Sequence, residues 1–169
     1  ALAAKALENH RVSEAVTEGE DARTLVGAGR VLAEERVVIV NHETLTECEP
    51  GHVGEIWVAG ESVAAGYWNR AEETAQPFHA QLAGSDDETR FLRTGDLGFL
   101  SGGELFVTGR LKDLVIIRGV NHYPQDIEQT VEESHPALRP GSGAAFSVVV
   151  TGEERLVVIN EVDHRQHPD

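Results

Sequence analysis

The sequence predicts an α+β fold, in which a strand-rich stretch precedes a shorter stretch that combines strands with one helix. From Thr24 to Val107, short apolar runs alternate with turn residues, a pattern typical of antiparallel sheets. After Gly109 the pattern changes to an uninterrupted apolar strand, a helix that opens on a proline, and two further strands. We therefore expect a small β-barrel-like or sandwich-like part, followed by a partial α+β part in the order strand, helix, strand, strand.

Residues 1–16 predict a short surface helix. Small apolar residues recur there at helical spacing beside charged ones, which gives the segment one apolar side. These apolar residues are Leu2, Ala3, Ala6 and Leu7. The stretch from Thr17 to Ala22, with the sequence TEGEDA, ends the helical pattern.

The strand-rich stretch contains short apolar runs bounded by turn residues. We expect strands at residues 24–27, 36–41, 52–60, 90–93, 98–100 and 104–109. The last two runs flank Ser101, Gly102 and Gly103, which is a hairpin signal. Residues 53–59 alternate between an apolar face and a mixed face, so we expect this strand to be buried on one side. A single helical turn at 71–75 and a solvated acidic loop at 84–89 interrupt the strands.

The tail after Gly109 begins with an apolar strand at Leu114–Ile117 and a turn of sequence RGVNHY. A helix then opens at Pro124, where the missing N–H of proline has no partner in any case. Asp126 in the first turn complements the helix dipole, and the helix stops before Pro136. Two strands follow, beginning at Ala144 and Arg155.

Composition restricts the functions that the chain could have. Its 169 residues include 14 basic and 29 acidic ones, and the formal charge of −15 would repel a phosphate backbone, so we expect no nucleic-acid partner. No apolar stretch is long enough to span a membrane. The single cysteine, Cys48, excludes an internal disulfide and suits the cytoplasm. We interpret it as a loop or packing residue.

Two charged residues are candidates for ligand binding. Asp96, in RTGDLG, follows a glycine, and its carboxylate could accept hydrogen bonds from two adjacent hydroxyls such as a ribose diol. The alternative is a turn residue that satisfies its own backbone. Arg110, in TGRLKD, could reach the same diol or a phosphate with its fork of donors, or could be an exposed residue at a strand end.

Further polar residues are ambiguous. Lys112 and Asp113 lie between two apolar segments and indicate either a hinge or an ordinary solvated turn. His122 and Tyr123 suggest either a general base or a capping position at a helix entry. The sequence has no HExxH, GxSxG, GxxxxGK[ST] or GxGxxG motif, so we expect no structural metal and no self-contained catalytic centre.

Several motifs taken together resemble the consecutive late motifs of adenylate-forming enzymes. They are GEIWVAGESVAAGYWNRAEETAQPF, FLRTGDLGFL, ELFVTGRLKDLVIIRG and NHYPQDIE. Within that superfamily they look most like fatty acyl-AMP ligases. The motifs cover Val53 to Glu128 densely, and their order and spacing make the resemblance more specific than any single motif.

The resemblance implies a fragment of a larger enzyme. Residues 26–110 would be the β-barrel subdomain that ends the large N-terminal adenylation domain, and residues 111–169 the hinge and part of the C-terminal domain. Residues 1–25 would be a lead-in and a family-specific insertion. By the same resemblance, Asp96 would bind the ribose hydroxyls, Arg110 would support the same nucleotide region, and Lys112 would be the hinge position.

The implied activity is the activation of a fatty acid with ATP and Mg²⁺, followed by transfer of the acyl group to an acyl carrier protein or polyketide synthase. The phosphate loop would precede this chain and the catalytic lysine would follow it, so no catalytic residue is expected within it. We therefore expect the chain alone to form no acyl adenylate. The alternatives are a fragment of an acyl-CoA ligase and a non-catalytic nucleotide-binding or interaction module.

Overall fold

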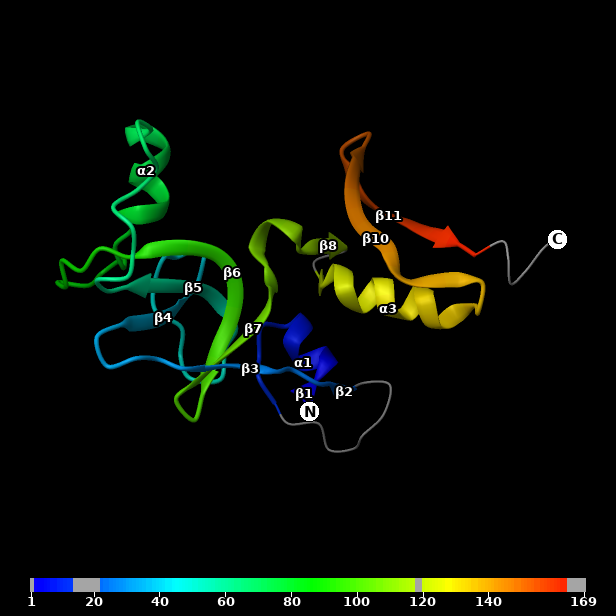
Figure 1. The fold of residues 1–169 in the computed structure, drawn as a ribbon, viewed down its shortest axis with the longest axis horizontal. Coiled ribbons are helices and arrows are strands. Elements are labelled where there is room, and N and C mark those ends of the chain that lie inside the picture. The colour runs from blue at the N-terminus through cyan, green and yellow to red at the C-terminus, as the bar shows by residue number, and fades with distance from the viewer. Residues whose placement is uncertain (1, 14–21, 118–119, 164–169) are drawn as a thin grey trace. The chain divides into compact units, whose positions relative to one another are not determined.

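The structure, a computed structural model, describes residues 2–13, 22–117 and 120–163. The chain divides into two compact units, Ala1–Leu111 and Lys112–Asp169. Both units mix helices with antiparallel strands, which confirms the predicted α+β character (Figure 1). No helix in the described ranges is long and apolar enough to cross a membrane.

The first unit is organised around a five-stranded antiparallel sheet with the order β3-β7-β6-β5-β4 (Figure 1). Its strands are β3 (Gly27–Arg30), β4 (Arg36–Val40), β5 (Gly54–Ala59), β6 (Leu92–Ser101) and β7 (Glu104–Arg110). The predicted hairpin is present, with Ser101 paired opposite Glu104. Among the described residues, β3 and β4 are the two edges and do not pair with each other, so the sheet is not a closed barrel.

The core of this unit lies against β4 and β5. Trp57 is its largest member and packs with Phe91, whose ring centroid lies 6.1 Å away. The expectation that β5 is buried on one side is wrong, because Glu55, Ile56 and Trp57 are all at most 3% exposed. The strand β5 lies inside the sheet, between β4 and β6, and both of its faces are covered. On one face, the missing side chain of Gly98 in β6 leaves space that the Ile56 side chain occupies.

Other segments of the first unit differ from the sequence prediction in length. The helix expected over residues 1–16 is only α1 (Ala4–Glu8), because the backbone turns left-handed at His10, with a φ of 54°. It is flanked by the short paired strands β1 (Leu2–Ala3) and β2 (Ala22–Arg23). Residues 9–13 of the predicted helix are described and are not helical, whereas residues 14–16 and most of TEGEDA lie outside the described ranges.

Further predicted segments of the first unit have other bounds in the structure. The helical turn expected at 71–75 is α2 (Ala71–Phe78), which continues through Pro77. The run expected at 98–100 and the second half of the run expected at 90–93 belong to one strand, β6, so residues 94–97 between them are part of the sheet rather than a turn. The strand expected at 24–27 begins only at Gly27, where β3 pairs with β7.

The second unit contains two hairpins and one helix. Its elements are β8 (Val115–Ile117), β9 (Val120–His122), α3 (Pro124–Ser134), β10 (Leu138–Val150) and β11 (Glu153–Val162). The helix begins at Pro124, as predicted. The RGVNHY segment is not simply a turn, because Val120–His122 pair with β8. The strand β10 is longer than predicted, and the Glu128 carboxylate of α3 accepts a hydrogen bond from the Ala145 N–H at 2.9 Å.

A histidine beside the first unit's sheet makes its stability depend on pH. Burial, reinforced by His42, lowers the pKa of His10 from its usual value, so the folded chain prefers neutral His10. The unfolded chain takes up this proton near pH 6.5, so the free energy of unfolding should fall as the pH drops below about 6.5. In His10→Asn, which suits the left-handed backbone, urea midpoints at pH 8 and pH 5.5 should differ less than in the wild type. An unchanged pH dependence would count against this assignment.

Candidate functional site

Asp96 lies in the middle of β6, at an irregular point of the strand. Gly95 before it has a φ of 74°, which favours glycine, and the register to β5 shifts so that residues 94–96 stand opposite the single residue Ile56. The tight turn expected around Asp96 is therefore a bulge within a continuous strand. A bulge of this kind changes the direction of a side chain without ending the sheet.

The two predicted nucleotide-binding residues lie side by side. Asp96 is the register partner of Arg110 in β7, and its Oδ1 atom lies 3.3 Å from the Nε atom of Arg110. The Asp96 side chain is 38% exposed and that of Arg110 is 60% exposed. An accessible ion pair of this kind contributes at most about 1 kcal/mol to stability. The pair therefore leaves charged groups at the surface of the sheet that the fold hardly needs.

A buried ion pair lies directly beneath this point and was not selected from the sequence. Glu55 of β5 is 2% exposed, and its carboxylate accepts hydrogen bonds from Arg93 Nε at 3.1 Å and from Arg93 Nη2 at 2.8 Å. The Arg93 guanidinium also lies 5.5 Å from the centroid of the Trp57 ring. The available signal was a glutamate in an apolar strand with an arginine in the next strand, since a buried charge needs a partner.

The same carboxylate reaches the backbone beside Asp96. Glu55 Oε1 accepts a hydrogen bond from the Gly95 N–H at 3.2 Å. Thr94 adds two further contacts: its hydroxyl donates to the carbonyl of Ile56 at 2.7 Å and accepts from the Asp96 N–H at 3.0 Å. The side chains of Glu55 and Thr94 thus connect the bulge that carries Asp96 to β5.

Lys112 lies in a 3₁₀ turn, Leu111–Asp113, and both Lys112 and Asp113 are exposed. The division between the two compact units falls between Leu111 and Lys112. The hinge position at Lys112 stays a prediction. His122 ends β9 and Tyr123 is the residue before α3, where it is buried.

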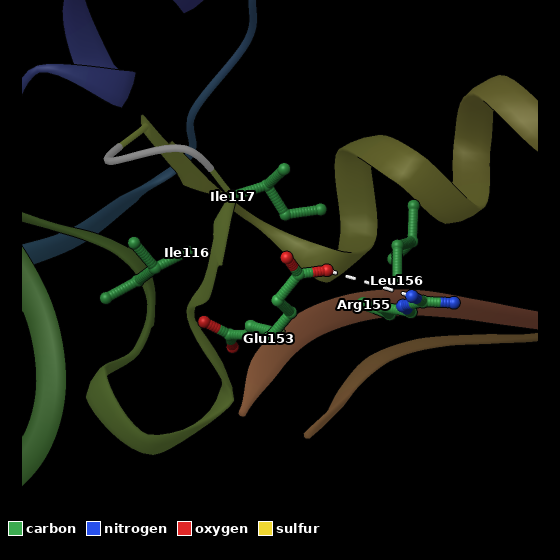
Figure 2. Close-up of a pocket in the computed structure, with 6 residues that line it drawn as sticks. Ile116, Ile117, Glu153, Arg155 and Leu156 are labelled. Atoms are coloured by element: carbon green, nitrogen blue, oxygen red, sulfur yellow. Dashed lines mark ion pairs between the residues drawn. The ribbon is translucent and has the colours of Figure 1, made fainter. Parts of the chain in front are cut away.

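An open groove in the second unit offers little for binding a polar ligand. It is lined by Ile116 and Ile117 of β8 and by residues 153–156 of β11 (Figure 2). Glu153 and Arg155 form an ion pair at 3.7 Å, and their side chains are 76% and 60% exposed. The charged groups are thus at the rim, whereas a small-molecule site usually holds a few polar groups within an enclosed cleft.

The described residues offer no cluster of three or more histidine, cysteine, aspartate or glutamate side chains that could hold a metal ion. Cys48 lies partly buried between β4 and β5, where burial raises the pKa of its thiol. Its Sγ atom would lie 2.9 Å from a Cβ atom placed on Gly54, so the thiol fills space beside that strand. This contact supports interpreting Cys48 as a packing residue.

Comparisons with known proteins identify the family. Residues 8–68 match the family described as AMP-binding enzyme, and residues 112–168 match the AMP domain described as Disco-interacting protein 2-like. The medium-chain-fatty-acid–[acyl-carrier-protein] ligase JamA of Moorena producens is 58% identical over 96% of this chain. The chain belongs to the AMP-binding enzyme family. Within that family it corresponds to a segment of the fatty acyl-AMP ligases.

Other members of the AMP-binding family agree with this assignment. The long-chain-fatty-acid–AMP ligase FadD32 of Mycobacterium marinum is 44% identical over 84% of the chain. A fatty acid AMP ligase from Legionella pneumophila matches 98% of the chain with 45% identity and a TM-score of 0.61. The chain spans 28% of JamA, 24% of FadD32 and 28% of the Legionella structure, or about a quarter of each.

Proposed function

We propose that this chain is the part of a fatty acyl-AMP ligase that holds the ribose side of the adenylate. The observation that carries the proposal is the pairing of Asp96 with Arg110 at the exposed bulge of β6. A carboxylate has about four acceptor positions, and one guanidinium contact leaves room for the two hydroxyls of a ribose. Arg110 adds a fixed positive charge on the same side, which suits the phosphate of an adenylate.

In the complete enzyme, the carboxylate oxygen of a fatty acid would attack the α-phosphorus of ATP, and pyrophosphate would leave. A thiol would then take the acyl group and release AMP. One of the similar structures, a Legionella fatty acyl-adenylate ligase, is described in complex with acyl adenylate and pyrophosphate, which supports this order. Asp96 and Arg110 would bind and orient the nucleotide, and Mg²⁺ would offset charge on its phosphates at groups outside this chain.

The remaining assignments belong to the same proposal. Residues 26–110 would be the barrel-like end of the N-terminal domain, and residues 111–169 would contain the hinge and part of the C-terminal domain. Lys112 would be the hinge position. Residues 1–25 would be the family-specific insertion. The acceptor would be an acyl carrier protein or polyketide synthase in the cytoplasm. For the carrier protein, the name of JamA as an acyl-carrier-protein ligase supports this proposal.

A second candidate is an acyl-CoA ligase, which shares the first half-reaction. A relative from Mycobacterium leprae, 50% identical over 79% of the chain, is named a putative fatty-acid–CoA ligase. Thioester formation by the full-length enzyme, measured with free coenzyme A and with a carrier protein in parallel, separates the two candidates. Product with the carrier protein alone would support the fatty acyl-AMP ligase.

The ribose-binding role predicts a loss of nucleotide affinity when Asp96 is changed. In the full-length enzyme, Asp96→Asn should raise the dissociation constant for AMP by about tenfold to a hundredfold, because hydrogen bonds to a charged group contribute roughly 1.5–3 kcal/mol. Isothermal titration calorimetry measures this change. Asp87→Asn is the matched control, since Asp87 is also paired with an arginine and its side chain is 35% exposed. Equal affinities in Asp96→Asn and wild type would contradict the assignment.

A further inference from the structure

The strand around Asp96 is paired on one side only. Asp96 pairs with Arg110 of β7, whereas the ladder to β5 runs from Glu55–Leu97 to Trp57–Arg93 and has no pairs for residues 94–96. Gly95 has the widest conformational freedom of any residue, and it adopts a left-handed conformation that few other residues favour. On the exposed side, Asp96 contacts only the accessible Arg110 side chain among the partners that the structure describes for its carboxylate. The direction of the carboxylate must therefore be fixed from the buried side.

Two side chains provide that restraint. Glu55 holds the Gly95 N–H, and Thr94 holds the Asp96 N–H while its hydroxyl donates to β5. Successive amides of the bulge are thus fixed to groups that lie beneath the surface. Arg93 is the ion-pair partner of the Glu55 carboxylate, which is only 2% exposed, and a buried charge needs such a partner.

Stability alone does not explain this arrangement. A buried ion pair contributes little more than well-packed apolar residues of similar volume would, and often less. Apolar residues at positions 55 and 93 could fill the same space, but they could not accept the hydrogen bond from Gly95. The geometry points to an additional role that requires an acceptor at position 55.

We propose that Glu55 and Thr94 are positioning residues for Asp96, and that they hold its carboxylate toward the ribose diol before the nucleotide binds. This inference rests on the proposed role of Asp96. A group that is held in place before binding contributes more to affinity than a group that must be ordered on binding, because ordering costs conformational entropy. Neither residue would contact the nucleotide itself.

The test is the discrimination between ATP and 3′-deoxyATP, which differ by one ribose hydroxyl. In the full-length enzyme, kcat/KM is measured for each nucleotide by pyrophosphate release with a medium-chain fatty acid. The readout is the ratio of the value for ATP to the value for 3′-deoxyATP. Glu55→Met, which has no oxygen to accept from the Gly95 N–H, and Thr94→Val should each lower the ratio by about tenfold, the effect of one misdirected hydrogen bond to a charged group. Thr94→Ser keeps the hydroxyl and should retain the wild-type ratio.

A purely structural role predicts a different result. If Glu55→Met and Thr94→Val reduce the use of both nucleotides equally and leave the ratio unchanged while Asp96→Asn abolishes the discrimination, the positioning inference is wrong and the role of Asp96 stands. If the wild type does not discriminate at all, the role of Asp96 fails as well. Glu73→Gln, in the exposed Arg70–Glu73 pair, is the control that should change nothing.

The chain itself provides a second measurement that needs no nucleotide. In Thr94→Val, hydrogen exchange at the Asp96 amide should accelerate, and in Glu55→Met exchange at the Gly95 amide should do so. This readout remains available if one of the variants loses enzymatic activity through misfolding elsewhere in the enzyme. Unchanged exchange in both variants would overturn the proposal.

Discussion

Trp57→Ala is expected to lower the free energy of unfolding by about 3–5 kcal/mol, the usual range for truncating a large buried aromatic residue. Trp57 is 1% exposed and lies in a cluster of buried apolar side chains. The other buried members are Val38, Val40, Ala59, Leu82 and Phe91. Because β4, β5 and the segment before β6 all contribute, the cavity cannot be closed by a movement of one loop.

Urea denaturation followed by far-UV circular dichroism measures this effect, and amide hydrogen exchange in β4 and β5 assigns it to the first unit. Trp68→Ala is the matched control, because Trp68 is 89% exposed. It should change the free energy of unfolding by no more than about 0.5 kcal/mol. Similar losses in the two variants would show that the core described around Trp57 is not the one that stabilises the unit.

The sequence predicted the central strands well because their signals are local. The apolar runs at 36–41 and 52–60 and the glycine pair after Ser101 specify β4, β5 and the β6–β7 hairpin, and Pro124 fixes the start of α3. Burial of β5 on both faces could not be predicted from its own alternating pattern. On the Trp57 face it depends on Phe91 and Leu82, which are distant in sequence from Trp57 and reach it only through the fold.

The candidate site shows the same limit. Asp96 and Arg110 were selected from their motifs, and the structure adds that they are register partners across β6 and β7. Glu55 and Arg93 were not selected, although both belong to the predicted strands. Their pairing depends on the register between β5 and β6, which shifts between Glu55 and Trp57. A bulge of this kind has no reliable signal in a single sequence.

Arg93→Met should also lower the free energy of unfolding by about 3–5 kcal/mol, because it leaves the Glu55 carboxylate buried without its charged partner. The control is Arg70→Met. Arg70 pairs with Glu73 at 2.7 Å, but both side chains are at least 60% exposed, so that loss should stay below about 1 kcal/mol. Urea denaturation of both variants compares them directly, and equal losses would mean that the Glu55–Arg93 pair is effectively hydrated.

The double variant Glu55→Met/Arg93→Met separates the two consequences of this pair. Removing both charges takes away the unpaired group, so most of the stability lost in Arg93→Met should return. The Gly95 N–H would still lack its acceptor, so exchange at that amide should remain faster than in the wild type. Stability recovered without recovery of Gly95 protection would mean that the fold tolerates apolar residues at these positions, and that the buried charge serves the strand bulge on which Asp96 is carried.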